Sequence, residues 1–248
     1  MAYARTDWFA WVASYLDLAA GSEVLDAGCG PAWLWQRAPG RIAEGLSLTL
    51  LDTSPGMVGE ARANLSASDC YARIEAAVAD AADIPFPDGH FDAVLLMHML
   101  YHTDDPAGVL AEARRVLRPG GKICVTLNGH DDLQEITDLI VDVFGSEPMD
   151  FAAARIFLDD AEGLMTSYFE KITRYDLMET YDCTDPDLVQ RFILSMPPAK
   201  VVDAEPHRSL RDTIRQAFAR GGGRLAVRKH TGLIVGRKRP DNTMIGAF

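Results

Sequence analysis

The sequence contains few of the features that would place a protein outside the cell or in a membrane. Its four cysteines, at positions 29, 70, 124 and 183, form no CxxC pair and no His/Cys spacing suited to zinc. We therefore expect reduced, individually buried thiols and no metal site. No apolar run approaches the roughly 20 residues of a membrane span, and Arg5, Asp7 and Asp17 interrupt the segment where a signal peptide would be apolar. These absences predict a soluble, cytoplasmic protein that does not bind membranes.

The sequence also contains fewer basic than acidic residues. The 24 lysines and arginines are outnumbered by 36 aspartates and glutamates, which gives a formal net charge of -12. A short basic run occurs only at residues 236–239. Because a phosphate backbone attracts the opposite sign of charge, nucleic acid is disfavoured as a partner, and a neutral or cationic small molecule fits better.

The sequence does contain the pattern of a single α/β domain spanning residues 1–248. With 48% hydrophobic residues, a chain of this length can bury a full core. Apolar runs alternate with helical periodicities, which is typical of an open parallel sheet. Strands are expected around residues 24–25 and at 46–51, 74–78, 91–97, 122–127, 172–180 and 225–237. Helices are expected at 1–20, 32–38, 57–65, 108–117, 133–144, 161–169, 187–195 and 209–219.

Two helical segments are candidates for covering a ligand. Residues 1–20 carry aromatic side chains at helical spacing, so they either pack on the core or form an N-terminal lid. Residues 184–223 interrupt the last two expected strands and form a helical insertion. We expect this insertion to act as a cap over the substrate.

Residues 23–35, with the sequence EVLDAGCGPAWLW, predict a buried strand, a tight turn and the start of a helix. Gly28 and Gly30 let the backbone approach a ligand where a Cβ would obstruct it, and the helix start offers unpaired N–H groups. The next strand stops at Asp52, 22 positions after Gly30 (52 minus 30). At this distance a βαβ unit places a carboxylate beside a ribose. The pattern therefore predicts a ligand that contains ribose.

Four segments together resemble the class I S-adenosylmethionine-dependent methyltransferases, in particular the small-molecule branch that includes quinone-type methyltransferases. They read VLDAGCGPAWLW, LTLLDTSPGMV, VADAADIPFPDGHFDAVLLMHMLYH and ARRVLRPGGKICVT, and they lie within residues 23–127. The resemblance implies a Rossmann-like sheet of seven strands, the last antiparallel, with helices on both faces and a small helical insertion between the last two strands. It also implies S-adenosyl-L-methionine as cofactor and S-adenosyl-L-homocysteine as product.

Two residues after the glycines bear on which family of nucleotide-binding proteins the segment resembles. A dinucleotide-binding dehydrogenase needs a third glycine three positions after Gly30, where this chain has Trp33. We expect that indole to prevent close helix packing under a pyrophosphate, which favours the methyltransferase because a sulfonium nucleoside has no phosphate. Ala32 departs from the family pattern, in which a glycine often follows the proline, and its methyl group is expected to narrow the pocket.

The resemblance assigns ten residues to the cofactor. Asp26 would neutralise an ammonium group, or it caps the turn by accepting backbone N–H bonds. Asp52 would bind both ribose hydroxyls, or it is an acid at a helix start. Asp80 would accept a hydrogen bond from the adenine amino group, or it is a solvated loop acid. The ten are Asp26, Gly28, Cys29, Gly30, Asp52, Thr53, Met57, Asp80, Ala81 and Met97.

The segment after the fourth expected strand is the candidate catalytic region. His98 and His102 are four positions apart, so a helical turn would place both on one face, with Tyr101 near them. The three residues are candidates for deprotonating or orienting an acceptor. The alternative is that His102 packs near the cofactor while His98 satisfies a loop carbonyl.

Methyl transfer from a sulfonium is an in-line displacement, and a base is needed only when the nucleophile must lose a proton. The expected function is transfer to an oxygen or nitrogen of a small organic, natural-product-like acceptor that Trp8 and His130 contact. One alternative is carbon methylation of a quinone or polyketide-type ring, and another is a catalytically silent cofactor-binding subunit. A homodimer is compatible with each. The remaining histidines, His90, His207 and His230, are interpreted as surface or loop residues.

Overall fold

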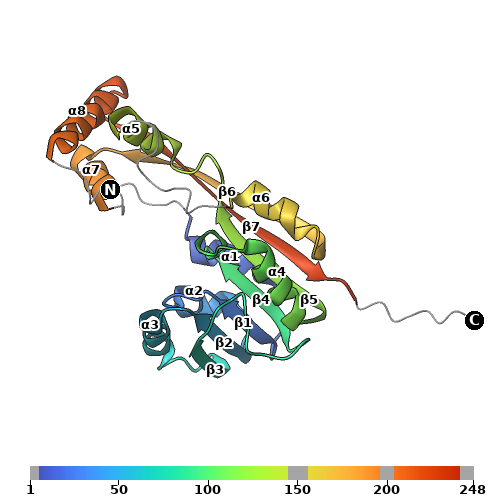
Figure 1. Ribbon diagram of the computed structural model, residues 1–248. Helices are drawn as coiled ribbons and strands as arrows, with labels where there is room; N and C mark the ends of the chain where they lie inside the picture. Colours follow the sequence, from blue (N-terminus) through green and yellow to red (C-terminus); the bar gives the residue numbers. More distant parts are fainter. Residues whose placement is uncertain (1–5, 145–155, 196–203, 241–248) are drawn as a thin grey trace, which may run out of the picture. The chain divides into compact units, whose positions relative to one another are not determined.

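Within residues 6–144, 156–195 and 204–240, which the computed structural model describes, a seven-stranded sheet forms the core (Figure 1). The strand order is β3-β2-β1-β4-β5-β7-β6. The last strand lies between β5 and β6 and is antiparallel, so the predicted α/β sheet is confirmed. The strands are β1 Glu23–Ala27, β2 Leu46–Asp52, β3 Tyr71–Val78, β4 Phe91–Met97, β5 Leu117–Asn128, β6 Phe169–Cys183 and β7 Leu225–Lys238.

The parallel part of the sheet brings the ends of three strands together. Strand β1 pairs in parallel with β2 on one side and β4 on the other, and β4 pairs in parallel with β5. In register, Ala27 lies opposite Leu51 and Met97 lies opposite Thr126. The turn after β1, the acid that ends β2 and the histidine segment after β4 therefore share the carboxyl edge of the sheet, where open α/β sheets bind ligands.

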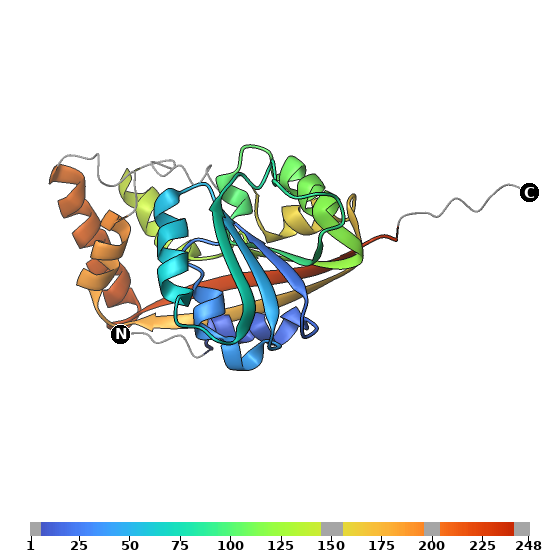
Figure 2. The same cartoon turned by 90° about the horizontal axis from the view of Figure 1, so that it is seen from below.

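Apolar residues that are adjacent along each strand bury on opposite faces of the sheet. Leu25 and Leu96 belong to one buried cluster, whereas Val24 and Leu95 belong to another. Figure 2 shows α4 and α6 on one face of the strands and α1 on the other. The helices are α1 Trp8–Leu16, α2 Trp33–Arg37, α3 Pro55–Leu65, α4 Pro106–Val116, α5 Gln134–Phe144, α6 Leu158–Met165, α7 Pro186–Ser195 and α8 Ala204–Arg220, with 3₁₀ turns η1 Pro39–Arg41 and η2 Leu100–His102.

The helix starts follow local capping chemistry. Asp7, Ser54 and Asp105 precede α1, α3 and α4, and each accepts a backbone N–H bond from the first turn. Proline fills an early position of α3 and α4, where its missing N–H costs nothing. These entry signals place both helices on the carboxyl side of the strands that precede them.

Several predicted boundaries differ from those of the structure, for example at α1, α6 and β5. Helix α1 covers only Trp8–Leu16 of the expected 1–20, of which residues 1–5 lie outside the described part. Helix α6 ends at Met165 because β6 already begins at Phe169. Strand β5 begins at Leu117 and not at 122 as predicted: residues 118–121 bulge within it, where the pairing with β4 moves from Phe91–Leu117 to Ala93–Lys122.

The chain divides into two compact units. Among the described residues, the sheet unit comprises 6–127, 156–175 and 232–240, and the helical unit comprises 128–144, 176–195 and 204–231. Helices α5, α7 and α8 lie side by side in the helical unit (Figures 1 and 2) and bury Leu139, Ile193 and Leu210 among them. Most of the predicted insertion 184–223 lies there, and residues 196–203 are outside the described part. The single-domain, lid and cap assignments stay predictions.

Candidate functional site

The glycine turn after β1 uses its two glycines for different reasons. Both have positive φ, +74° at Gly28 and +51° at Gly30. A Cβ on Gly28 would lie 2.7 Å from the Cβ of Met99, so this position must be glycine to admit the neighbouring chain. A Cβ on Gly30 would meet nothing within 4 Å. Only Gly30 leaves open space beside the backbone, and the predicted ligand contacts of both glycines stay predictions.

Asp52 holds this turn in place. Its Oδ2 accepts the Gly30 N–H at 2.9 Å and its Oδ1 accepts the Ser54 N–H at 2.9 Å. The N–H groups of Gly28 and Cys29 both donate to the Leu51 carbonyl, at 2.7 and 2.9 Å. Because each carboxylate oxygen can accept two hydrogen bonds, both oxygens of Asp52 retain capacity for a ligand. The carboxylate is thus fixed in position before any ligand arrives.

Asp26 is buried in β1 with 2% of its surface exposed. Its Oδ2 accepts the indole N–H of Trp35 at 2.7 Å, whereas its Oδ1 is buried and has no hydrogen-bond partner among the described residues. Burial raises the pKa of Asp26 to about 7; the Trp35 hydrogen bond opposes the rise and the charge of Asp52 adds to it. The alternative that Asp26 caps the turn through backbone N–H groups is wrong, because its partner is a side chain of α2.

The thiol beside these carboxylates is not a nucleophile. Cys29 is half-buried, and its Sγ donates to the Gly30 carbonyl at 3.4 Å. Burial raises its pKa, and the charges of Asp26 and Asp52 raise it further. Cys29 is therefore a protonated thiol. All four cysteines are free, as predicted, although only Cys124 is fully buried.

The helix entry beside the turn contains two further departures from expectation. Ala32, the N-cap residue of α2, has a φ of +58° and therefore lies in the left-handed region that L-residues rarely adopt. Its side chain is 1% exposed. This conformation explains why a glycine suits the position. Trp33 is 47% exposed and its ring lies 5.1 Å from the Arg37 guanidinium carbon. Contrary to the prediction, Trp33 therefore does not block close helix packing, because its indole is exposed.

The remaining predicted cofactor residues line the same edge. Asp80 is exposed and its Oδ1 accepts the Ala82 N–H at 2.9 Å, while the buried Ala81 packs in the core. The Ala79 N–H donates to the Asp52 carbonyl at 3.2 Å, which ties this loop to the end of β2. Three others are exposed Thr53 and Met57 at the start of α3, and half-buried Met97 at the end of β4.

The histidine segment does not form the expected helical turn. His98 has φ +51°, and its N–H donates to the carbonyl and the hydroxyl of Thr126, each at 3.0 Å. The 3₁₀ turn begins only at Leu100, so His98 and His102 are not on one helical face. The left-handed residue instead directs the chain away from the strand end, and the predicted residues are arranged as a row of rings.

This ring row joins α1 to the end of β4. The Trp8 and His98 centroids are 5.2 Å apart, those of His98 and Tyr101 are 6.3 Å apart, and those of Tyr101 and His102 are 4.5 Å apart. The Trp8 Nε1 is buried without a hydrogen-bond partner in the described part of the chain. His98 and Tyr101 are half-buried and His102 is exposed. Trp8 and His98 thus meet at the carboxyl end of β4. Packing of α1 on the core is confirmed by its buried residues Val12 and Leu16.

Two histidines of the helical unit, His130 and His230, were given different roles by the sequence analysis. His130 is exposed on the turn after β5, and its predicted contact with an acceptor stays a prediction. His230 was expected at the surface but is 9% exposed on β7. Its Nδ1 lies 2.5 Å from Asp131 and its Nε2 lies 2.7 Å from Asp176. Because ionised carboxylates only accept hydrogen bonds, this arrangement favours the imidazolium form of His230, in which both ring nitrogens donate.

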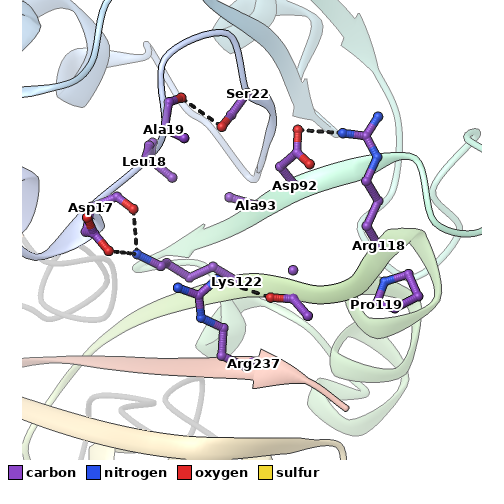
Figure 3. Close-up of a pocket in the computed structure, with 12 residues that line it drawn as sticks. Asp17, Leu18, Ala19, Ser22, Asp92, Ala93, Arg118, Pro119, Lys122 and Arg237 are labelled. Atoms are coloured by element: carbon purple, nitrogen blue, oxygen red, sulfur yellow. Dashed lines mark hydrogen bonds and ion pairs between the residues drawn. The ribbon is translucent and has the colours of Figure 1, made fainter. Parts of the chain in front are cut away.

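A separate cleft of about 450 Å³ lies at the amino edge of the sheet (Figure 3). Its cationic side chains are engaged by protein groups. Lys122 donates to the Leu16 and Asp17 carbonyls at 2.5 and 2.7 Å and to the Asp17 carboxylate at 3.1 Å, so it caps the end of α1. Arg118 pairs with Asp92 at 2.5 Å. The charged side chains that line this cleft therefore make structural contacts at the edge of the sheet opposite the glycine turn.

Comparison with known proteins decides between the nucleotide-binding families. The sequence profile of the family described as "Methyltransferase domain" matches residues 25–125. This part of the chain therefore matches a methyltransferase domain. It contains the glycine turn, Asp52, Asp80 and the ring segment after β4, so the resemblance drawn from the four sequence segments is confirmed.

Two relatives of this part of the chain are named as methyltransferases. The chain is 35% identical over 117 residues to the 27-O-demethylrifamycin SV methyltransferase of Amycolatopsis mediterranei, covering 46% of this chain and 41% of the relative. It is 37% identical over 120 residues to a ubiquinone biosynthesis O-methyltransferase of Xanthomonas oryzae pv. oryzae, covering 48% of each. The chain thus spans less than half the length of these relatives.

The fold itself is shared over nearly the whole chain. The crystal structure of the YcgJ protein of Bacillus subtilis superposes with a TM-score of 0.64 at 16% identity and covers 94% of this chain and 98% of that one. The described residues contain no helix long and apolar enough to cross a membrane, and no group of three or more His, Cys, Asp or Glu side chains that would hold a metal ion.

Proposed function

We propose that this protein is an S-adenosyl-L-methionine-dependent methyltransferase that acts on a small organic acceptor. The observation that carries the proposal is the arrangement of Asp26, Gly30 and Asp52 around one turn. A buried carboxylate oxygen without a partner among the described residues lies at the end of the strand before the turn, and within the turn an open glycine backbone donates a hydrogen bond to a positioned carboxylate. Homologues named as small-molecule methyltransferases support the same assignment.

The residues present suit each part of the cofactor. The free Oδ1 of Asp26 suits an ammonium group, directly or through water, because a buried acceptor lacking a donor is costly. The open side of Gly30 admits the methionine chain, and the spare acceptor capacity of Asp52 suits the two ribose hydroxyls. The Asp80 loop follows β3, where Asp52 lies opposite Val78, and suits the adenine.

The bound cofactor would supply an electron-poor methyl group: the acceptor's lone pair forms the new bond while the carbon–sulfur bond breaks and the sulfur keeps its electron pair. The chain's own task is mainly to hold the acceptor in line and exclude water. In this proposal His98 takes the proton from an acceptor hydroxyl or amine on an imidazole nitrogen. Tyr101 and Trp8 orient the acceptor, and His102, at the exposed end of the row, assists.

An oxygen or nitrogen acceptor is preferred because His98 and Tyr101 lie together at the end of β4. The two named O-methyltransferase relatives support oxygen. Carbon methylation would need no base, so a His98→Ala variant with unchanged turnover would favour that alternative. The proposal further places the enzyme in the cytoplasm, and covers the acceptor with α1 as a lid.

Calorimetry with S-adenosyl-L-homocysteine tests the cofactor assignment. Replacing Asp52 by alanine removes charge-assisted hydrogen bonds that contribute roughly 1.5–3 kcal/mol each, so affinity should fall by about 100-fold or more. Glu60→Ala, an exposed acid on α3, is the matched control and should bind as the parent does. Equal affinity of Asp52→Ala and parent would refute the ribose assignment.

Transfer of a labelled methyl group to a panel of phenols, amines and quinols tests the activity. Incorporation into a phenol or amine supports the oxygen or nitrogen acceptor, and incorporation at ring carbon supports the alternative. Tight cofactor binding without transfer to any co-purified or added acceptor would favour the catalytically silent subunit.

A further inference from the structure

Trp35 lies on the helix that follows the glycine turn, and the cofactor contacts proposed above do not include it. It lies on α2 with 1% of its surface exposed. Its indole N–H donates to Asp26 Oδ2 at 2.7 Å. The Tyr71 hydroxyl donates to the Trp35 carbonyl at 2.6 Å, and the two rings meet edge to face at 6.1 Å. The indole is therefore held in one orientation by β1 on one side and β3 on the other.

The indole N–H is the only hydrogen-bond donor to Asp26 among the described residues. One carboxylate oxygen is occupied by Trp35, which sets the torsion of the carboxyl group and leaves the other oxygen, Oδ1, buried and unused. Without this bond both oxygens would be buried acceptors lacking a donor, a condition that favours the protonated acid. A protonated acid cannot attract a cation.

We propose that Trp35 is a positioning residue that keeps Asp26 ionised and its Oδ1 available for the ammonium group of the cofactor, so that cofactor affinity depends on pH near neutrality. This inference rests on the proposed function, since it concerns the same turn. Trp35 itself touches no reacting atom. Its contribution passes through the Asp26 carboxylate alone.

The groups that face Asp26 from neighbouring elements define the sign of the effect. From β2, the carboxylate of Asp52 opposes ionisation, and from the turn the Cys29 thiol stays neutral. Strand β4 places the apolar Leu95 opposite Asp26, and Tyr71 of β3 acts only through the Trp35 carbonyl. Trp35 is thus the group favouring the charged form, against burial and Asp52, which together raise the pKa of Asp26 to about 7.

Cofactor binding should therefore weaken as pH falls through this value. An ammonium ligand selects the ionised carboxylate, so below the pKa the affinity decreases about tenfold per pH unit. Replacing Trp35 by phenylalanine keeps an aromatic ring and removes the N–H. The pKa of Asp26 should then rise, and the decline in affinity should begin at higher pH.

The test is calorimetric titration of S-adenosyl-L-homocysteine between pH 5.5 and 9.5. Trp35→Phe should shift the midpoint of the affinity decline upward by about one pH unit, which is roughly tenfold weaker binding at pH 6.5, and should approach the parent's affinity at pH 9.5. Trp33→Phe, on the exposed indole of the same helix, is the control and should keep the parent's profile. Asp26→Asn should bind weakly with no such midpoint.

Each result bears on one of the two claims. No binding by the parent at any pH overturns the proposed function, whereas binding with the same midpoint in parent and Trp35→Phe overturns only the role of Trp35. A loss that is equal at every pH also overturns it, because that is the signature of general damage to the turn. Should Trp35→Phe fail to fold, the indole ¹⁵N–H signal of Trp35 in the parent provides the readout, assigned by elimination with phenylalanine variants of the other three tryptophans. It should titrate with Asp26 in the free protein and shift when the ligand binds; a signal insensitive to both would overturn the inference.

Discussion

Replacing Asp26 by asparagine should make the free protein more stable at and above neutral pH. The side chain is buried and its ionised form has one hydrogen bond, to Trp35. A carboxyl group whose pKa is higher in the folded state than in the unfolded chain stabilises the fold while protonated, and this contribution is lost as pH rises. The folded value is about 7 and the ordinary value is 3.8, so the loss occurs between these two pH values.

The magnitude follows from the size of the shift. A difference of about three pKa units corresponds to roughly 4 kcal/mol of unfavourable free energy above pH 7. Asparagine is never charged and can still accept the Trp35 N–H through its carbonyl oxygen. Its buried NH₂ group lacks an acceptor, which costs about 1–3 kcal/mol. The net gain in the free energy of unfolding should be about 1–3 kcal/mol at pH 8.

Urea unfolding at pH 5, 6, 7 and 8, followed by tryptophan fluorescence and far-ultraviolet circular dichroism, measures this difference. The free energy of unfolding of Asp26→Asn minus that of the parent should increase by roughly 1.4 kcal/mol per pH unit up to pH 7 and then level off. Asp83→Asn, a change at an exposed acid of the same unit, is the control. A difference that is constant across the series would refute the reasoning, because it would show that Asp26 has the same proton affinity in both states.

Two further predictions concern charged groups outside the cofactor turn. Lys122→Met keeps the apolar stem but removes the ammonium that caps the end of α1, so urea unfolding should show a loss of roughly 2–4 kcal/mol; Arg239→Met, an exposed control, should show almost none, and equal stabilities would contradict the capping role. For His230, burial acts to lower the pKa, but the hydrogen bonds to Asp176 and Asp131 outweigh it and leave the pKa above 6.5. A group with a raised pKa stabilises the fold fully below its unfolded value and loses this contribution as pH rises through the folded value. The destabilisation caused by His230→Gln should therefore be largest below pH 6.5 and diminish above it; a pH-independent loss would show that His230 acts through packing alone.

The amino-acid sequence by itself determined the order of the elements and the carboxyl edge as the site. A short apolar run predicts a buried parallel strand, and a capping side chain followed by proline predicts the start of a helix. Neighbouring residues alone therefore predict β4 Phe91–Met97 and the start of α3. The spacing from Gly30 to Asp52 is equally local, because one βαβ unit fixes it. The structure then joins the two residues by a hydrogen bond of 2.9 Å.

Tertiary structure alone decided which groups meet and how deeply they are buried. Asp26 accepts a hydrogen bond from Trp35 and not from backbone N–H groups, and a Cβ on Gly28 would clash with Met99. His230 lies between two carboxylates from residues 99 and 54 positions away in the sequence. His98 takes a left-handed conformation that its neighbours in sequence do not demand. The physical reason is that backbone preference and apolar periodicity act over a few residues, whereas desolvation and the pairing of polar side chains depend on distant segments packing together.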